Sequence, residues 1–279
     1  MKKLVLIDGH NLLFRMFYGI PASIHNKKGI EIKGVIGFLG ALKKIDNILK
    51  STSMVVIFDS ETSTSNNLSL LEDYKSNRPS FNDVPDDENP FIGLPIIKNA
   101  LKFLDIPFYE VEDDEADDYI ASIASQYQKE FDEVVIVSND SDFYQLIDDN
   151  IFIYSARGKL SKLYDEVAFL EKYFIKSNQY VEYKSLVGDN ADNIKGVKGI
   201  GKKTASEILT FDSIDNYVAR SSNERIKKIL EDNEDIIERN KKLITLNRHL
   251  DIEDVDIGVL SDKIHRYSVY EILSSIDAR

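Results

Sequence analysis

The chain has 279 residues, which is enough for one large domain or two small ones with a full hydrophobic core. Hydrophobic residues make up 43% of it, and no apolar run approaches the roughly 20 residues of a membrane span, so we expect no membrane protein. There is no cysteine, which excludes disulfides and thiolate metal sites and fits a cytoplasmic location. The net charge of -13 argues against nucleic-acid binding unless cations neutralise many of the carboxylates.

The first half of the chain alternates short apolar runs with helix-like stretches. Strands are predicted at 3–8, 54–59, 133–138 and 151–155, and helices at about 35–49, 91–104 and 116–129. Continuous apolar strands separated by helices indicate an α/β fold, with a mostly parallel central sheet covered by helices. Ligands bind such sheets outside the carboxyl ends of the strands, and there several of these runs end in Asp.

The remaining sequence has a different character. Residues 60–90 form a polar connection with three prolines and a predicted short helix near 68–74, and a connection this long is usually functional or disordered. After about residue 165 the pattern predicts only helices, at 166–174, 178–187, 203–209, 214–219 and 223–246. We therefore expect an α/β core over residues 1–165 and a helical region over residues 166–279.

Carboxylates gather at the predicted strand ends and at two helix starts. They are Asp8, Asp59, Glu115, Asp117, Asp118, Asp140, Asp142, Asp189 and Asp192. Oxygen ligands without Cys or His suit Mg2+ or Mn2+, and two such ions about 4 Å apart can promote phosphodiester hydrolysis. Each acid taken alone is better explained as a turn, cap or helix-dipole residue. Their joint occurrence predicts the acidic metal site of a phosphohydrolase.

A glycine- and lysine-rich stretch within about 185–210 predicts a helix-hairpin-helix. It reads Gly196-Val-Lys-Gly-Ile-Gly-Lys-Lys-Thr-Ala205. Gly199 and Gly201 let the backbone approach a phosphate, and the helix that begins near Lys202, Lys203 and Thr204 directs free N–H groups at it. A structural glycine turn is the alternative. The coincidence of the glycine spacing with lysines favours binding of the DNA backbone without sequence readout.

A basic motif, Tyr74-Lys-Ser-Asn-Arg78, lies inside the polar connection. On its own it is best explained as a solvated loop. Its place between Asp59 and Glu115 favours a role at a phosphate, with Lys75 stabilising charge and Tyr74 stacking on a base.

Together these motifs resemble the 5'-nuclease family, which includes the 5'→3' exonuclease domain of bacterial DNA polymerase I, phage 5' nucleases and flap endonucleases. The resemblance covers about residues 4–210, from Ile7-Asp-Gly9 through Ile57-Phe-Asp59, Glu115-Ala-Asp-Asp118 and Gly188-Asp-Asn-Ala-Asp-Asn193 to the hairpin. It implies a standalone enzyme with a PIN-like core, a helical arch at about 60–90 that admits a single-stranded 5' flap, and a helix-three-turn-helix type of hairpin.

The resemblance also implies a role for each candidate residue. Asp8, Asp59, Glu115, Asp117 and Asp140, with Asp118 alongside, would hold the tighter divalent ion, and Asp142, Asp189 and Asp192 the second. Lys75 and Arg78 would be catalytic and phosphate-gripping, and Arg15 would contact a phosphate. The carbonyls of Val197 and Ile200 would hold a K+ ion between protein and DNA.

The expected activity is that of a structure-specific 5' nuclease, acting as a 5'→3' exonuclease and 5'-flap endonuclease. Its substrates would be DNA with 5' flaps, nicks or frayed 5' ends, its products would carry a 5'-phosphate and a 3'-hydroxyl, and it would work as a monomer. Two alternatives stay open. The intact acid set argues against a catalytically weak branched-DNA-binding protein, and the hairpin and chain length argue against a compact PIN-type RNA nuclease.

Overall fold

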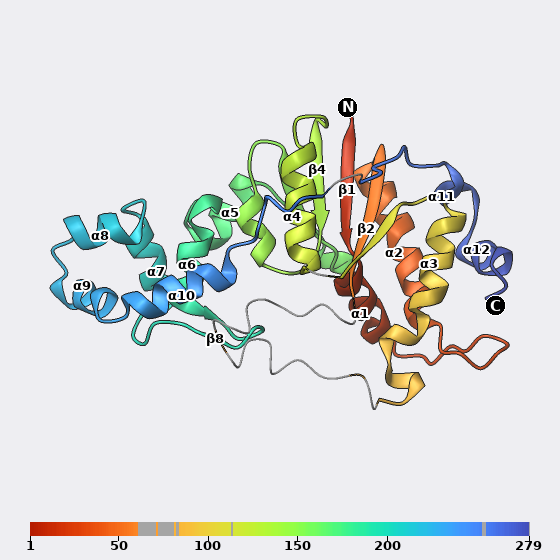
Figure 1. The fold of residues 1–279 in the computed structure, drawn as a ribbon, viewed down its shortest axis with the longest axis horizontal. Coiled ribbons are helices and arrows are strands. Elements are labelled where there is room, and N and C mark those ends of the chain that lie inside the picture. The colour runs from red at the N-terminus through yellow and green to blue at the C-terminus, as the bar shows by residue number, and fades with distance from the viewer. Residues whose placement is uncertain (61–70, 72–80, 82–83, 113, 253–254, 279) are drawn as a thin grey trace.

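The structure is a computed structural model that describes residues 1–60, 71, 81, 84–112, 114–252 and 255–278. A six-stranded sheet forms its centre (Figure 1). The strand order is β3 (Phe108–Val111), β2 (Ser53–Asp59), β1 (Lys3–Asp8), β4 (Glu133–Val137), β5 (Ile151–Ser155) and β6 (Lys162–Tyr164). Every pair is parallel except β5 with β6, so the predicted α/β class is confirmed.

The four predicted strands are confirmed. Their apolar side chains are buried on both faces of the sheet, which explains the continuous apolar runs in the sequence. Val134, Val135 and Ile136, for example, are fully buried. In the pairing of β1 with β2, Asp8 lies beside Ile57, so the carboxyl ends of the two strands lie at the same end of the sheet. The edge strands β3 and β6 were not predicted, since they are short and largely half-buried or exposed.

Helices cover both faces of the sheet (Figure 1). One layer is made by α1 (Gly9–Gly19), α2 (Lys33–Leu49) and α3 (Leu94–Phe103), whose apolar residues pack against the Val5 and Ile7 face of β1. The other layer begins with α4 (Ala116–Tyr127), which packs on the Leu4 and Leu6 face. Short 3-10 helices lie at η2 (Asp86–Glu88), η3 (Pro90–Gly93), η4 (Asp142–Leu146), η5 (Gly158–Leu160) and η6 (Ser177–Gln179).

The C-terminal helices extend from the α4 side of the sheet (Figure 1). They are α5 (Glu166–Tyr173), α6 (Tyr180–Val187), α7 (Lys202–Leu209), α8 (Ile214–Arg220), α9 (Glu224–Glu231) and α10 (Glu234–Ile244). Phe169, Tyr183 and Ile208 belong to the same buried cluster as Ile120 of α4. This half therefore packs on the sheet layer through a continuous core.

Two expectations for the C-terminal half were wrong. The single helix predicted over 223–246 is two helices, α9 and α10, interrupted at Asp232 and Asn233, both of which favour turns over helix interiors. The half is also not purely helical. A two-stranded antiparallel ribbon, β7 (Gly188–Asp189) with β8 (Ile194–Lys195), lies between α6 and α7 in the sequence. The backbone segments at Gly188 and Gly196 lie so close together that a side chain at either position would collide with the other segment.

The last two helices return to the first layer. α11 (Lys263–Arg266) and α12 (Val269–Ser275) bury Ile264, Ile272 and Leu273 in the cluster of α2 and α3. The Lys43 ammonium donates hydrogen bonds to the carbonyl oxygens of Ile264 and, at 2.7 Å, Tyr267. No sequence motif predicted this return. Among the described residues, no helix is both long and apolar enough to cross a membrane.

Candidate functional site: carboxylates at the strand ends and a helical hairpin

The first carboxylate group lies where β1 and β2 end. Asp8 caps α1, accepting the Asn11 N–H at 3.0 Å on one oxygen and the Ser138 hydroxyl at 2.7 Å on the other. Asp59 accepts the Ala116 N–H at 2.9 Å, which ties the end of β2 to the start of α4. Parallel strands that end together thus bring Asp8, Asp59 and the first turn of α4 to one edge of the sheet.

Asp8 lies in a strongly negative environment. Its pKa is raised to about 6, first because the side chain is buried and also because the charges of Asp59 and Asp140 lie nearby, while the hydrogen bonds from Ser138 and Asn11 oppose the shift. A carboxylate that is buried beside two others is costly without a compensating cation. This edge of the sheet therefore fits a divalent ion chemically, because its donors are oxygen atoms with excess negative charge.

We expect Asp8→Asn to stabilise the metal-free protein at neutral pH by roughly 1–3 kcal/mol. A carboxyl group with a raised pKa adds stability below its usual value of 3.8, and that contribution is lost as the pH rises through about 6. In EDTA the wild type should therefore lose stability between about pH 4 and pH 7, and the variant should lose less. Denaturant unfolding at several pH values measures the difference, and identical pH profiles would refute the expectation.

The acids of α4 extend this group. Glu115 is the N-cap residue of α4, and Asp117 and Asp118 lie in its first turn. The Asp118 carboxylate accepts the N–H of Asn247 at 2.7 Å, so it also anchors the segment after α10. His10, which the sequence analysis did not single out, lies at the same edge, with its Nδ1 3.5 Å from Oδ2 of Asp59.

The second carboxylate group consists of Asp142, Asp189 and Asp192. One oxygen from each lies within 4.8 Å of the others, and among the described residues this is the one group of three or more acidic or His side chains with the spacing of a metal site. Asp142 begins η4 after β4, and Asp189 belongs to the β7–β8 ribbon. The fold therefore brings together three acids that the sequence places in two separate motifs.

Lys184 is a functional candidate that the sequence analysis missed. It is buried in α6, at 4% exposure, and its ammonium forms ion pairs with both Asp142 and Asp189. Burial raises the pKa of Asp142 to about 7, although the Lys184 charge opposes the shift. A buried lysine held by two of the three acids compensates part of their charge. The residues beside Lys184 in the sequence, Tyr183 and Ser185, do not indicate that its side chain would lie among the acids.

Asp140 connects the two groups. Its Oδ1 accepts the N–H of Asp142 at 2.9 Å, and its charge raises the pKa of both Asp8 and Asp142. Asp140 therefore lies between the two sets, and the convergence of all nine acids on one metal site stays a prediction. The positions of Glu115 and Asp117 beside Asp59 follow from the start of α4.

Two arginines lie near this acidic edge. Arg15, on α1, has a lowered pKa, first because of burial and second because of the nearby charge of Arg157. Arg157 donates a hydrogen bond of 3.2 Å from Nε to the side-chain oxygen of Asn139, which also accepts the hydroxyl of Ser155. Two guanidinium groups that repel each other beside a carboxylate site are well placed for a phosphate. Arg157 carried no motif and was not predicted.

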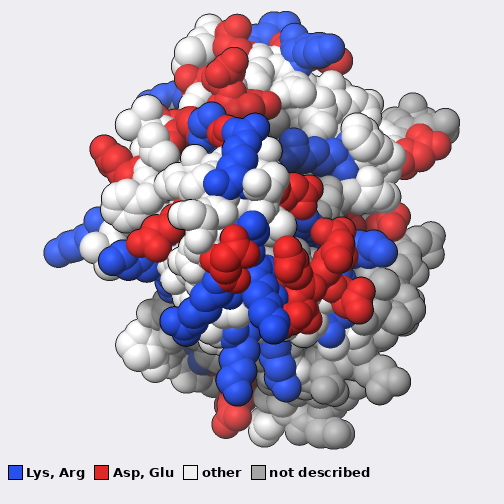
Figure 2. Space-filling model, turned by 90° about the vertical axis from the view of Figure 1, so that its left-hand side faces the viewer, with Lys and Arg blue, Asp and Glu red and all other residues white. Residues whose placement is uncertain are grey.

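The hairpin follows the second acidic group. Gly199 has φ +95, a conformation that favours glycine, and Gly201 is the N-cap residue of α7, whose first residues are Lys202, Lys203 and Thr204. The Val197 carbonyl accepts the Ile200 N–H at 3.0 Å, which closes the turn. Figure 2, which faces the C-terminal helices, shows basic side chains gathered in the lower part of that end beside acidic ones, so the net charge hides a mixed surface.

The basic motif of the polar connection, with Tyr74, Lys75 and Arg78, lies outside the described residues, as does the short helix predicted near 68–74 apart from Leu71. Two described residues of the connection have contacts on opposite halves of the protein. Leu71 packs against Ile194, Leu243 and Ile244 of the C-terminal half. Phe81 packs against Phe14 and Phe91, with ring centroids 5.3 and 5.4 Å apart.

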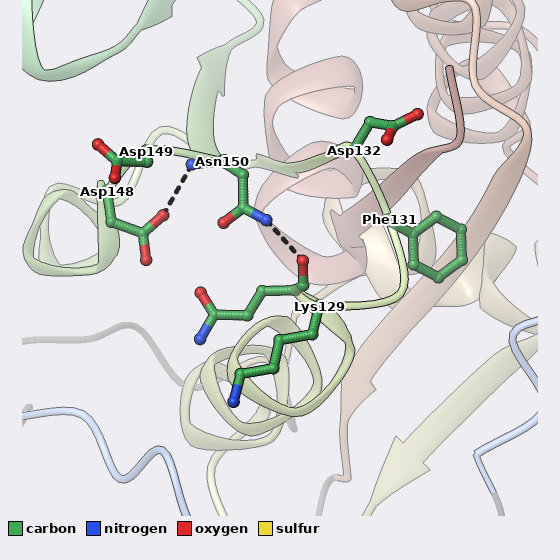
Figure 3. A pocket seen from close by; sticks show the side chains of 7 residues that line it. Lys129, Phe131, Asp132, Asp148, Asp149 and Asn150 are labelled. Atoms are coloured by element: carbon green, nitrogen blue, oxygen red, sulfur yellow. Dashed lines mark hydrogen bonds between the residues drawn. The ribbon is translucent and has the colours of Figure 1, made fainter.

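Acidic side chains also occur at the other end of the sheet. Asp132, Asp148 and Asp149 line a shallow cavity of about 570 Å3 beside the amino ends of β4 and β5 (Figure 3). There Asp148 accepts the Asn150 N–H at 3.0 Å, and the Asn150 amide donates to the Gln128 carbonyl. Asp148 thus has a turn role and Asp132 accepts the N–H of Lys2, so these acids provide a comparison for the carboxyl-end site.

The fold and the site define a class of α/β proteins that have carboxylates at the carboxyl ends of the strands and a helical hairpin in the C-terminal half. A model of the 5'-3' exonuclease N-terminal resolvase-like domain matches residues 3–174, and a model of the 5'-3' exonuclease C-terminal SAM fold matches residues 175–262. The chain therefore belongs to the 5'-3' exonuclease family.

Individual relatives agree with this assignment. The chain is 34% identical to DNA polymerase I of Bacillus caldotenax over 258 residues, which is 90% of this chain and 29% of the polymerase. It is 28% identical to the 5'-3' exonuclease of Aquifex aeolicus over 287 residues, covering 99% of this chain and 96% of that protein. The chain thus spans less than a third of the polymerase that it matches.

Solved structures share the fold. A bacteriophage T5 flap endonuclease, crystallised as a pseudo-enzyme-product complex with DNA and metal ions, aligns with a TM-score of 0.72 at 21% identity, covering 99% of this chain and 100% of that one. A T5 5'-exonuclease with bound zinc aligns with a TM-score of 0.71 at 22% identity, covering 88% and 90% of the two chains.

Proposed function

We propose that this protein is a structure-specific 5' nuclease that hydrolyses DNA at flaps, nicks and frayed 5' ends, acting as a 5'→3' exonuclease and 5'-flap endonuclease. The observation that carries the proposal is the pair of carboxylate groups at the strand ends, joined through Asp140, in a chain of the 5'-3' exonuclease family. So many acids at one edge are best explained by bound cations, and oxygen donors suit Mg2+ or Mn2+.

The chain's own residues would divide into two metal-binding sets. Asp8, Asp59, Glu115, Asp117 and Asp140, with Asp118 alongside, would hold one ion, and Asp142, Asp189 and Asp192 the other. Bound divalent ions supply an activated water and charge stabilisation for in-line displacement at phosphorus. Cleavage of the 3' oxygen–phosphorus bond by water leaves a 5'-phosphate and a 3'-hydroxyl.

The DNA backbone would be held on both sides of that site. On the hairpin side, the backbone at Gly199 and Gly201 and the groups of Lys202, Lys203 and Thr204 would contact phosphates, with a K+ ion bridging the carbonyls of Val197 and Ile200 to the DNA. On the sheet side, the pair of guanidinium groups formed by Arg15 and Arg157 would contact a phosphate near Asp140.

The polar connection would form the arch around a single-stranded 5' end. Leu71 and Phe81 pack on opposite halves of the protein, which supports a connection that passes over the acidic edge. Within it, Lys75 and Arg78 would stabilise the scissile phosphate and grip its neighbour, and Tyr74 would stack on a base.

A 5'-flap DNA labelled at its 5' end tests the proposal. With Mg2+ we expect a labelled product released at the junction, and with EDTA no product. Binding without metal-dependent cleavage would support a branched-DNA-binding protein instead. Preferential cleavage of the same flap made in RNA would support a PIN-type RNA nuclease. A 3'-end label on the same strand reports the 5'-phosphate through its ligation to a neighbouring 3'-hydroxyl.

A further inference from the structure

Phe174 occupies an unfavourable position. It is the C-cap residue of α5, with φ +59, in the left-handed region that bulky side chains rarely adopt and that usually selects glycine at a helix end. Its side chain is also 74% exposed. Backbone strain and an aromatic ring in water both oppose a phenylalanine here. Both costs would be offset by a ligand that contacts the Phe174 ring.

Phe174 forms part of the wall of a groove beside the hairpin. The groove has a volume of about 640 Å3 and lies between the end of α5 and the exposed side of α7, with Tyr173 and Tyr183 among its lining residues. The hydroxyl of Ser206 on α7 donates a 2.9 Å hydrogen bond to the Tyr173 carbonyl, which fixes the two walls together. The aromatic wall is therefore attached to the helix that follows Gly199 and Gly201.

The walls carry complementary chemistry. On one side, the Lys172 ammonium lies 4.9 Å from the ring centre of Tyr173 and 4.8 Å from that of Tyr164. These cation–π contacts stabilise the positions of the two rings. On the other side, Lys202 and Lys203 line the groove, and the Lys203 side chain is 92% exposed, with its ammonium 3.9 Å from the carboxylate of Glu207, which also lines the groove. The exposed ring of Phe174 and the exposed ammonium groups of Lys202 and Lys203 suit a ligand that has both a flat face and negative charge.

We propose that this groove binds an unpaired nucleotide of single-stranded DNA, with its base on the Phe174 ring and its flanking phosphates on Lys202 and Lys203. A duplex hides its base faces in the stack, whereas an unpaired strand presents them, so the ring favours the single strand. The groove continues from the hairpin, whose turn at Gly199 and Gly201 we propose contacts the duplex backbone, so that Lys202 and Lys203 lie where duplex and single strand meet. A branched substrate has both kinds of DNA within reach, and this inference rests on that proposed function.

Fluorescence anisotropy with a labelled oligothymidine of about ten nucleotides tests the groove directly. Measurements in EDTA at one fixed salt concentration prevent cleavage and keep phosphate contacts comparable. We expect Phe174→Ala to weaken single-strand binding at least about fivefold, since stacking of one base contributes that much or more. Phe174→Tyr, which keeps the ring, should bind as the wild type does, and neither variant should change binding to a blunt duplex more than about twofold.

Val167→Ala is the matched control, because Val167 is also an exposed apolar residue of α5, at 65% exposure, but does not line the groove. It should bind the single strand like the wild type. Lys203→Gln should lower the salt dependence of single-strand binding. Thermal unfolding of each variant distinguishes lost contacts from lost folding.

Equal single-strand binding by Phe174→Ala and the wild type would overturn the proposal, and so would an equal loss in Phe174→Tyr. A concentration-dependent dimer that Phe174→Ala abolishes would assign the groove to a second copy of the chain instead. The nuclease proposal is judged separately by flap cleavage with Mg2+. If the wild type cleaves flaps but Phe174→Ala binds single strands normally, only the groove assignment fails. If the wild type does not cleave, the anisotropy comparison still decides the groove.

Discussion

Asp140→Asn should reduce metal-dependent flap cleavage by at least about 100-fold, which corresponds to roughly 3 kcal/mol of transition-state stabilisation. Asp140 is the residue that connects both carboxylate groups, since its charge affects Asp8 as well as Asp142. Asparagine keeps an oxygen that can accept the N–H of Asp142, so the local turn should survive. The loss should therefore appear in turnover and in metal affinity, with little change in the melting temperature.

The matched control is Asp149→Asn at the other end of the sheet (Figure 3). It removes the same charge from an exposed acidic residue at the amino ends of the strands. Its cleavage rate should stay within about twofold of the wild type, because a surface charge far from the site is largely screened. If both variants lost activity equally, the effect would be one of net charge, and the assignment of Asp140 would be wrong.

Lys184→Met should lower the free energy of unfolding of the metal-free protein by about 3–5 kcal/mol. The substitution keeps much of the side-chain volume and removes the ammonium, which leaves the buried Asp142 and the half-buried Asp189 together without their partner. Breaking a buried pair on one side is costly because the remaining charge is not solvated. Denaturant unfolding in EDTA measures this loss.

Added Mg2+ should restore more stability to Lys184→Met than it adds to the wild type. The reason is that a divalent ion at Asp142, Asp189 and Asp192 would replace the missing positive charge. Lys98→Met is the control, since the ion pair of Lys98 with Glu110 is partly exposed and should contribute under about 1 kcal/mol. A Lys184→Met protein as stable as the wild type in EDTA would contradict the structural role given to this lysine.

The sequence predicted the parts of the fold that depend on local pattern. The continuous apolar runs of β1 and β4 predicted buried parallel strands, and in such a sheet Asp8 and Asp140 must lie near one edge. The glycine-lysine pattern likewise predicted a turn before α7, and Gly199 has the positive φ that such a turn requires. These features follow from side-chain periodicity and backbone sterics, which need no knowledge of long-range packing.

Other features depend on contacts between distant segments and had no local signal. Lys184 resembles any helical lysine until α6 brings it between Asp142 and Asp189. Arg157 follows β5 without a motif, yet the sheet places it beside Arg15. The return of α11 and α12 to the first layer rests on Ile264 and Ile272, which are ordinary apolar residues in the sequence. Long-range packing decided each of these positions.

We propose that the carboxylates at the strand ends hold two divalent cations. Crystals grown with Mn2+ and measured at the manganese absorption edge test it most directly. We predict two anomalous peaks, one among Asp8, Asp59, Glu115 and Asp140, and one among Asp142, Asp189 and Asp192, the second weakening first as Mn2+ is diluted. Peaks confined to other acids, such as Asp132 and Asp148 at the opposite end of the sheet, would contradict the account.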